Sequence, residues 1–333
     1  MKIFRSLLIV LFTLCLYRGG QAQITRVGSI GLTVHNMDRS VQFFHDVLGF
    51  RKTSDTEVQG TGYENLEGIF GLRMRIVQMQ LGDETIALTG YLTSGGRSIP
   101  EDARSNDLIF QHVAIVVSNM EEAYSHLRKY MVMHVSTGPQ TLPASNKAAA
   151  GIKAFYFHDP DMHNLELIYF PRGKGQPKWQ TTNGKLFLGI DHTAIGVRNT
   201  DSSLHFYRDM LGIQRKGDSW NMGMEQAHLN FVEGASLHIT GLRTDAGPGI
   251  EFLQYLSPGP GKPYPEDTRA DDIWYWQTAL KTIDAEKLYE QLKNAGYHFV
   301  SKGVVVFKNS EGGKIKAFIV RDPDGHALLI EEI

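Results

Sequence analysis

Cysteine is almost missing from this sequence of 333 residues, because the single one, Cys15, lies close to the N-terminus. If the segment that holds Cys15 is removed during export, the mature protein can form no disulfide bond and has no thiolate for catalysis. An excess of one charge is also lacking, because 34 basic side chains balance 36 acidic ones. No basic stripe with interleaved aromatic residues occurs, so the sequence indicates no nucleic-acid partner.

Motifs of several common enzyme classes are absent as well. The segment SPGPGK at 257–262 lies in no strand–helix context, so we interpret it as a loop rather than a phosphate-binding site. No motif for a serine or cysteine nucleophile occurs. Hydrophobic residues nevertheless make up 42% of the chain and aromatic residues 10%, which is enough for a substantial core.

The first 22 residues have the pattern of a secretory signal peptide. The basic start MKIFR precedes an apolar run of 11 residues at 7–17, and small residues follow at Gly20 and Ala22. This run is too short to span a bilayer, which takes about 20 residues. The sequence therefore predicts cleavage after Ala22, a secreted or periplasmic protein and no stable membrane insertion. The alternative is an uncleaved anchor helix.

The rest of the chain repeats itself. Residues 29–50 and 192–213, at an offset of 163, share 8 identical residues among 22 positions. Residues 153–166 and 316–329 share 8 of 14 at the same offset. This self-similarity indicates a tandem duplication of a unit of about 150 residues. The predicted organisation is a signal peptide, a first unit, a linker rich in glycine and proline, and a second unit, at 1–22, 23–172, 173–186 and 187–333.

Each unit is itself halved. At 29–34 an alternating strand leads into a helix in which Val41, Phe44 and Leu48 recur at spacings of three and four, and Gly49 ends that helix. Strand-like runs follow, and then a second strand–helix pair with its own final strands, at 75–81, 85–92, 111–117, 120–129, 154–157 and 165–170. The pattern predicts an α+β chain of four βαβββ modules, two in each unit.

The opening segments QHVAIVV and DHTAIGV, the NxDxSxxFxxDxLG helix and the DPDxHxLEL ending resemble the vicinal oxygen chelate superfamily. That superfamily includes glyoxalase I, extradiol dioxygenases, fosfomycin-resistance proteins and methylmalonyl-CoA epimerase. The resemblance covers residues 25–333. It implies that two modules pair into an open barrel around one divalent metal ion, with ligands from the first and last strand of each module.

Carried over by this resemblance, the ligand positions differ between modules. In the second and third modules they hold good metal ligands, namely His112, Glu166, His192 and Glu251. In the first and fourth modules they hold Ser29, Ala87, Gln277 and Leu329, which cannot bind a metal together. Neither unit alone has a complete site. We therefore expect crossed pairing, in which modules two and three form one barrel with a metal site and modules one and four form a second barrel without one.

The physical setting of the two glutamates supports this prediction. Glu166 lies between Leu165 and Leu167, and Glu251 lies in a similar apolar strand. Strand side chains alternate between faces, so each glutamate points away from its apolar neighbours and into the barrel. A buried carboxylate needs a partner, and two imidazoles with two carboxylates suit one Zn, Ni, Co, Fe or Mn ion. A lone strand histidine or glutamate is more often structural or exposed, so the prediction depends on all four positions.

Other features concern the surroundings of this site. Small residues follow the ligand positions on the first strands, which predicts a cavity rather than a filled barrel. Tyr255 and His238 are candidates to line that pocket. His163 and His326 follow the DPD turn in both units, and that duplication favours a structural role for both.

The ligand set bears on the reaction. By the resemblance, two histidines and two glutamates imply a glyoxalase-like lyase or isomerase that passes through a metal-stabilised enolate, with Glu166 or Glu251 as both ligand and general base. The substrate would be a small, oxygen-rich molecule. One alternative is an extradiol-type ring-cleaving dioxygenase, in which one glutamate is not a ligand. The other is a non-catalytic binding protein of the same fold.

Overall fold

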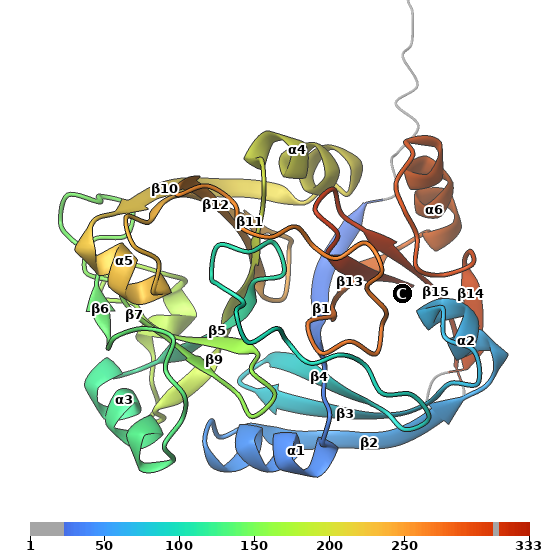
Figure 1. Cartoon of the computed structure of the whole chain (residues 1–333), viewed down its shortest axis with the longest axis horizontal. Coiled ribbons are helices and arrows are strands. Elements are labelled where there is room, and N and C mark those ends of the chain that lie inside the picture. Colours follow the sequence, from blue (N-terminus) through green and yellow to red (C-terminus); the bar gives the residue numbers. More distant parts are fainter. Residues whose placement is uncertain (1–22, 309–312) are drawn as a thin grey trace, which may run out of the picture.

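The computed structural model describes residues 23–308 and 313–333 (Figure 1). The predicted signal peptide, residues 1–22, lies outside the described residues. Within the described part of the chain, no helix is both long and apolar enough to cross a membrane.

Two eight-stranded sheets form the framework of the molecule. The strands of the first sheet are, in spatial order, β14 (Val305–Lys308), β15 (Lys314–Arg321), β16 (Ala327–Glu332), β13 (Trp276–Thr282), β1 (Ile24–Thr33), β4 (Glu84–Tyr91), β3 (Arg73–Leu81) and β2 (Arg51–Gln59). Those of the second are β10 (Gln214–Met222), β11 (Ser236–Arg243), β12 (Gly249–Ser257), β9 (Phe187–Gly196), β5 (Gln111–Val117), β8 (Asn164–Tyr169), β7 (Lys153–His158) and β6 (Gln140–Thr141).

The order of the strands confirms the crossed pairing. Strands β1–β4, β5–β8, β9–β12 and β13–β16 make up modules one to four along the chain. β5 of module two pairs antiparallel with β9 of module three, and β1 of module one pairs antiparallel with β13 of module four. Each sheet therefore joins modules of different units. We call the sheet of modules two and three the inner barrel, and that of modules one and four the outer barrel.

Helices connect the first two strands of each module, and each begins at a side chain that caps it. Asn36 accepts a hydrogen bond from the amide of Arg39, and Asn119, Asn199 and Asp284 make the equivalent bond in the other modules. The helices are α1 (Met37–Asp46), α3 (Met120–Lys129), α4 (Thr200–Leu204) with the π-helical turn η2 (His205–Met210), and α6 (Ala285–Asn294). Gly49, which has a φ of +73°, follows the predicted first helix.

Two further short helices were not predicted. They are α2 (Thr61–Glu67) in module one and α5 (Met224–Asn230) in module three. In the outer barrel α2 contacts β14 of module four, and in the inner barrel α5 contacts β6 and β7 of module two. Each helix therefore reaches across to the partner module of its barrel.

The outward faces of the sheets pack against the helices and form the core. Leu165 and Leu167 on β8 are fully buried in one cluster with Ala123 and Leu127 of α3. Burial of a leucine side chain stabilises the fold by about 1.5–3 kcal/mol. Because residues alternate along a strand, this packing turns Glu166 toward the interior of the barrel, as predicted.

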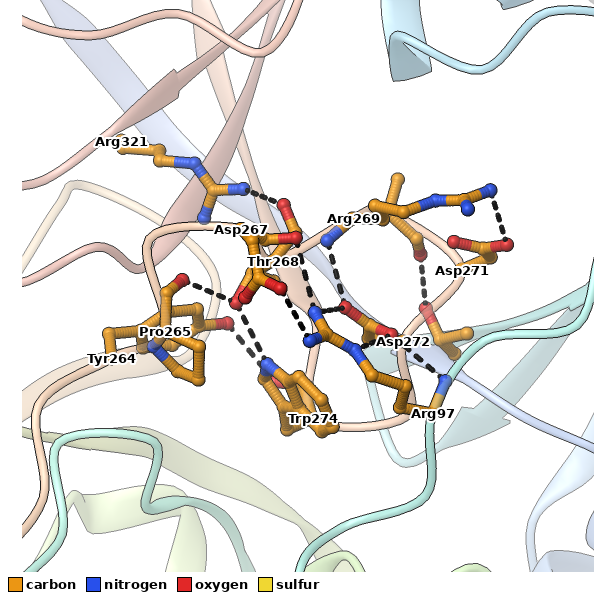
Figure 2. A network of polar contacts seen from close by, with 12 residues as sticks. Arg97, Tyr264, Pro265, Asp267, Thr268, Arg269, Asp271, Asp272, Trp274 and Arg321 are labelled. Carbon is orange, nitrogen blue, oxygen red and sulfur yellow. Dashed lines mark hydrogen bonds and ion pairs between the residues drawn. The ribbon is translucent and has the colours of Figure 1, made fainter.

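The two loops that join modules within a unit also join the units to each other. The loop at 258–275 carries PEDTRADD, and the loop at 92–110 carries the related PEDARSND. Figure 2 shows Arg97 of one loop against Asp272 of the other, where Nη2 lies 2.7 Å from Oδ2, and against Asp267. The Asp272 side chain is buried, whereas that of Arg97 is about half exposed, so the pairing lies at the edge of the interior.

The histidines after the DPD turns hold these loops in place. His163 bonds to Asp159 through Nδ1 and to the carbonyl of Ile273 through Nε2, at 2.8 and 2.9 Å. His326 makes the same two contacts with Asp322 and the carbonyl of Leu108. The contacts support the structural role that the duplication indicated for both histidines.

The segment predicted as a linker also packs onto the fold. It contains a short 3-10 helix, η1 (Pro177–Gln180), and Trp179 on this helix is buried. The indole nitrogen of Trp179 donates to Asp191 Oδ1 over 2.6 Å. Residues 173–186 therefore form part of the wall around the inner barrel.

Candidate metal centre

The strand register places the four predicted ligands at equivalent points. On parallel neighbouring strands, Glu166 lies opposite Ala114, two residues beyond His112, and Glu251 lies opposite Ala194, two residues beyond His192. The outer barrel has the same register, with Ala87 opposite Gly31 and Leu329 opposite Ala279. The position assigned to Glu251 across a one-residue insertion therefore agrees with that in the other three modules.

The four side chains converge inside the inner barrel. The Nε2 atoms of His112 and His192 lie 3.4 Å apart. Oε2 of Glu166 lies 3.1 Å from Nε2 of His112 and 3.5 Å from that of His192. Oε2 of Glu251 lies 3.3 Å from Nε2 of His192. Four potential ligand atoms from two units of the chain thus surround one point.

The two glutamates differ in exposure. The side chain of Glu166 is 6% exposed and touches both imidazoles, whereas that of Glu251 is 30% exposed and touches His192 alone. Burial by itself would raise the pKa of Glu166, but hydrogen bonds from His112 and His192 lower it to about 2. Glu166 is therefore a fixed carboxylate, while Glu251 is more exposed and is held by fewer contacts.

The charges of the cluster fit a divalent cation. Burial would lower the pKa of His192, but the carboxylates of Glu251, Asp191 and Glu166 raise it well above its usual value. With both imidazoles neutral, as metal ligation requires, these three carboxylates and the guanidinium of Arg243 leave two negative charges at the cluster. Two imidazole nitrogens that face each other with carboxylate oxygens beside them are a donor set suited to Zn²⁺ and its neighbours. His112, Glu166 and His192 form the most compact part of this set.

Asp191 is a residue of the site that the sequence analysis missed. Its Oδ2 accepts from Nδ1 of His192 over 3.0 Å and from Arg243 over 2.6 Å. A carboxylate on the far nitrogen of a histidine fixes the tautomer and directs Nε2 at a metal ion. The sequence feature that could have indicated Asp191 is an acidic residue directly before the predicted ligand His192 in an otherwise apolar strand. His112 has no such partner within the described part of the chain, and its ring packs against Tyr156 at 4.8 Å.

We expect Asp191→Asn to weaken metal affinity by about 10- to 100-fold, because the amide cannot balance Arg243 and holds the His192 ring less firmly. Competition with a chromogenic chelator measures this change. Asp159→Asn is the matched control, since it alters an equally buried Asp–His pair that touches no member of the cluster. It should lower stability and leave metal affinity alone. Equal metal affinity for Asp191→Asn and the native chain would contradict the role given to Asp191.

A cavity of about 500 Å³ adjoins the cluster. Glu166, His192 and Glu251 line it, and its other polar lining residues include Gln176, Lys216, Asp218, Ser219, Asn221, Gln226 and Arg243. Apolar side chains complete the wall, among them Leu142, Ile152, Ile168, Phe170, Leu229 and Leu253. The cavity is thus lined by both polar and apolar side chains.

Neither predicted pocket residue is among those that line this cavity. The hydroxyl of Tyr255 is buried and bonds to the Asn230 amide, which in turn bonds to Gln226. His238 pairs with Asp218 and stacks on Trp220 at 4.7 Å. Tyr255 therefore lies behind Asn230 and Gln226, and His238 lies behind Asp218. The alternation of side chains along a strand correctly predicted the sheet face on which both residues lie. Residues of α5 and β10 cover them, however, and the local sequence pattern did not predict which elements would do so.

Comparison with known proteins decides the family. The profile of the Glyoxalase/Bleomycin resistance protein/Dioxygenase superfamily matches residues 26–167 and 189–330. The chain belongs to this superfamily. The resemblance drawn from the opening, helix and ending motifs is thereby confirmed, together with the fold that it implied.

Two relatives show the range of this superfamily. A 2-epi-5-epi-valiolone epimerase from Actinomyces sp is 29% identical over 167 residues, which cover 48% of this chain and 87% of that protein. The crystal structure of glyoxalase I from Zea mays has a TM-score of 0.59 at 15% identity and covers 92% of both chains. The second likeness extends over both units and concerns the fold alone.

Proposed function

We propose that this protein is a metal-dependent isomerase or lyase that moves a proton next to a carbonyl group of a small, oxygen-rich substrate. The observation that carries the proposal is the convergence of His112, His192, Glu166 and Glu251 beside a cavity. Membership of the superfamily supports a divalent metal ion at this point, and the similarity to an epimerase supports an isomerisation.

The two glutamates have different roles in the proposed reaction. A divalent ion held by the four side chains would act as a Lewis acid that stabilises negative charge developing on substrate oxygens. Glu166 is buried against both histidines, so it serves to anchor. Glu251 also lines the cavity, but it is more exposed and contacts one imidazole, so it serves as the base that takes a proton from carbon and returns it.

The cavity supports a hydroxylated substrate. Amide and hydroxyl groups of Gln176, Ser219, Asn221 and Gln226 can exchange hydrogen bonds with several substrate oxygens. Of the two basic side chains in the lining, Arg243 is paired with Asp191, and Lys216 donates to the side-chain amide of Gln214. A volume of about 500 Å³ is in the range, about 300–1,000 Å³, of small-molecule sites.

Export is a further part of the proposal and is supported by the pattern of residues 1–22 alone. A glutathione-derived substrate is not expected outside the cytoplasm, so export favours a different substrate from that of glyoxalase I. The N-terminal sequence of the secreted chain tests this part, and a mature protein that begins at Gln23 is expected.

The experiment for the activity is hydrogen exchange in deuterated water. The protein is loaded separately with Zn²⁺, Ni²⁺, Co²⁺, Mn²⁺ and Fe²⁺ and given a panel of polyhydroxylated ketones and hydroxycarbonyl compounds. We expect deuterium to be incorporated at a carbon next to a carbonyl only when the metal is bound. NMR spectroscopy measures this incorporation. Exchange that does not depend on the metal, or no exchange with any combination, would refute the proposed chemistry.

The compact group within the site supports a second candidate. His112, Glu166 and His192 alone form a set of two histidines and one carboxylate, the arrangement of iron-dependent oxygenases, with the more exposed Glu251 outside it. Consumption of oxygen by the Fe²⁺-loaded protein with a catechol, without hydrogen exchange, would favour a ring-cleaving dioxygenase. Tight binding of a ligand with neither reaction would favour a binding protein.

A further inference from the structure

The outer barrel contains a cavity of its own. It has a volume of about 320 Å³, and the four positions that correspond to the metal ligands, Ser29, Ala87, Gln277 and Leu329, all line it. The cavity therefore lies at the position that corresponds to the metal site, although the metal-ligating side chains are replaced. Of the described residues, none around this cavity belongs to a group of three metal-ligating side chains. The cavity is suited to a molecule rather than to a metal ion.

A buried carboxyl group lies in this cavity where the inner barrel has an amide. Glu67 of α2 is 5% exposed, and its Oε2 accepts from Nε2 of Gln277 over 2.6 Å and from the hydroxyl of Tyr91 over 3.3 Å. The equivalent pair in the inner barrel is Asn230 with Tyr255. Gln277 occupies a position that corresponds to a metal ligand, and its side chain donates a hydrogen bond to Glu67 instead of binding a metal ion.

Glu67 does not bring a full negative charge into the cavity at neutral pH. Burial raises its pKa to about 7, although the hydrogen bonds from Gln277 and Tyr91 oppose this shift. The other charged groups of the lining, Lys281 and Glu331, pair with each other at 2.8 Å. The cavity as a whole is therefore close to neutral.

Tyr275 provides a second, independent observation. Its side chain is fully buried and lines the same cavity, yet its hydroxyl has no hydrogen-bond partner of good geometry within the described residues, although Gln277 lies beside it. Burial of a hydroxyl without a hydrogen-bond partner is unfavourable, so a hydroxyl that finds no partner in the protein usually bonds to a water molecule or a ligand.

We propose that the outer barrel is a second small-molecule site, free of metal, that binds an uncharged molecule with several hydroxyl groups between Glu67, Gln277 and Tyr275. Hydroxyls of Ser29, Ser54, Thr56 and Thr89 line the cavity and add donors and acceptors, while Leu66, Met74, Ile76 and Leu329 provide an apolar wall. The volume is at the lower limit of the range of small-molecule sites, about 300–1,000 Å³, so the ligand is about the size of a single sugar ring.

Ligand-observed NMR on the full chain tests this site separately from the metal centre. The protein is stripped of metal with a chelator, and the His112→Ala chain provides a second background. The probes are myo-inositol, D-glucose and dihydroxyacetone, with D-glucuronate and D-glucosamine as charged analogues. We expect a neutral probe to bind in both backgrounds. Each charged analogue should bind about tenfold more weakly, because a buried carboxylate would repel Glu67 and a buried ammonium would find less than a full opposite charge there.

Variants assign the binding to the cavity. Tyr275→Phe should weaken binding about tenfold without lowering the melting temperature, since its hydroxyl has no partner to lose. Ala87→Met should fill the cavity and abolish binding. Tyr255→Phe, which removes the buried hydroxyl of the inner barrel, is the matched control and should leave affinity unchanged.

Three results would overturn the proposal. They are no binding of any neutral probe, tighter binding of a charged analogue, and binding that survives both Tyr275→Phe and Ala87→Met. Because the metal is removed throughout, none of these outcomes depends on the activity proposed for the inner barrel.

Discussion

His112→Ala and His192→Ala should each remove the metal ion, although the two histidines belong to different units of the chain. The native protein should bind one divalent ion, and each variant should lose more than about 100-fold in affinity, because the loss of a direct ligand exceeds that of a supporting contact. The reason is the antiparallel pairing of β5 with β9, which brings the two Nε2 atoms to 3.4 Å. Elemental analysis after dialysis against a metal buffer measures the loss.

The controls for this experiment are buried histidines outside the cluster. His163→Gln and His326→Gln break the contacts with Asp159 and Asp322 and should lower stability, yet they should leave one ion bound. If only one of the two cluster variants lost its metal, the site would lie within one unit. If the native chain held two ions, the outer barrel would have to bind one of them.

Glu251→Gln should abolish turnover while the metal stays bound. The amide oxygen can still approach the ion but cannot take a proton, so we expect the rate of hydrogen exchange to fall about 100- to 10,000-fold. Glu166→Gln should lose the metal instead, because its buried oxygen contacts both imidazoles. Metal content and exchange rate, measured on the same preparations, separate the two effects.

Glu67→Gln is the matched control, since it changes a buried carboxyl group of the outer barrel. It should leave exchange by the inner barrel unchanged. Unimpaired exchange by Glu251→Gln would remove that residue as the base. If Glu166→Gln kept its metal and lost turnover, the two roles would be reversed.

Much of the fold could be predicted because its signals are local. The repeat at an offset of 163, the helix spacing of Val41, Phe44 and Leu48, and the alternation around Glu166 all lie within short stretches of the chain. The crossed pairing is a long-range property, yet it was predictable, because ligands are missing in complementary modules. When a metal site takes its ligands from two units, each unit contains only half of the ligand residues, and this is visible in the sequence.

The partly wrong predictions concern neighbours that are distant in the sequence. Tyr255 was assigned to the pocket from its strand face, but Asn230 of α5 stands between its hydroxyl and Gln226 in the wall. Residues 173–186 were predicted as a linker, and the structure adds that Trp179 within them packs onto Asp191. Local patterns contain no information about which segment covers a given strand face.

By itself, the sequence determined the duplicated modules, the face that each strand turns inward and the set of ligand candidates, because strand and helix periodicity depend on neighbouring residues. Only the tertiary structure decided that Asp191 joins His192 to Arg243, that Glu251 is more exposed than Glu166, and that Glu67 lies beside Gln277 in the outer barrel. Contacts such as that of Glu67 with Gln277 join residues 210 positions apart, and no local pattern encodes which of the many possible long-range packings is most stable.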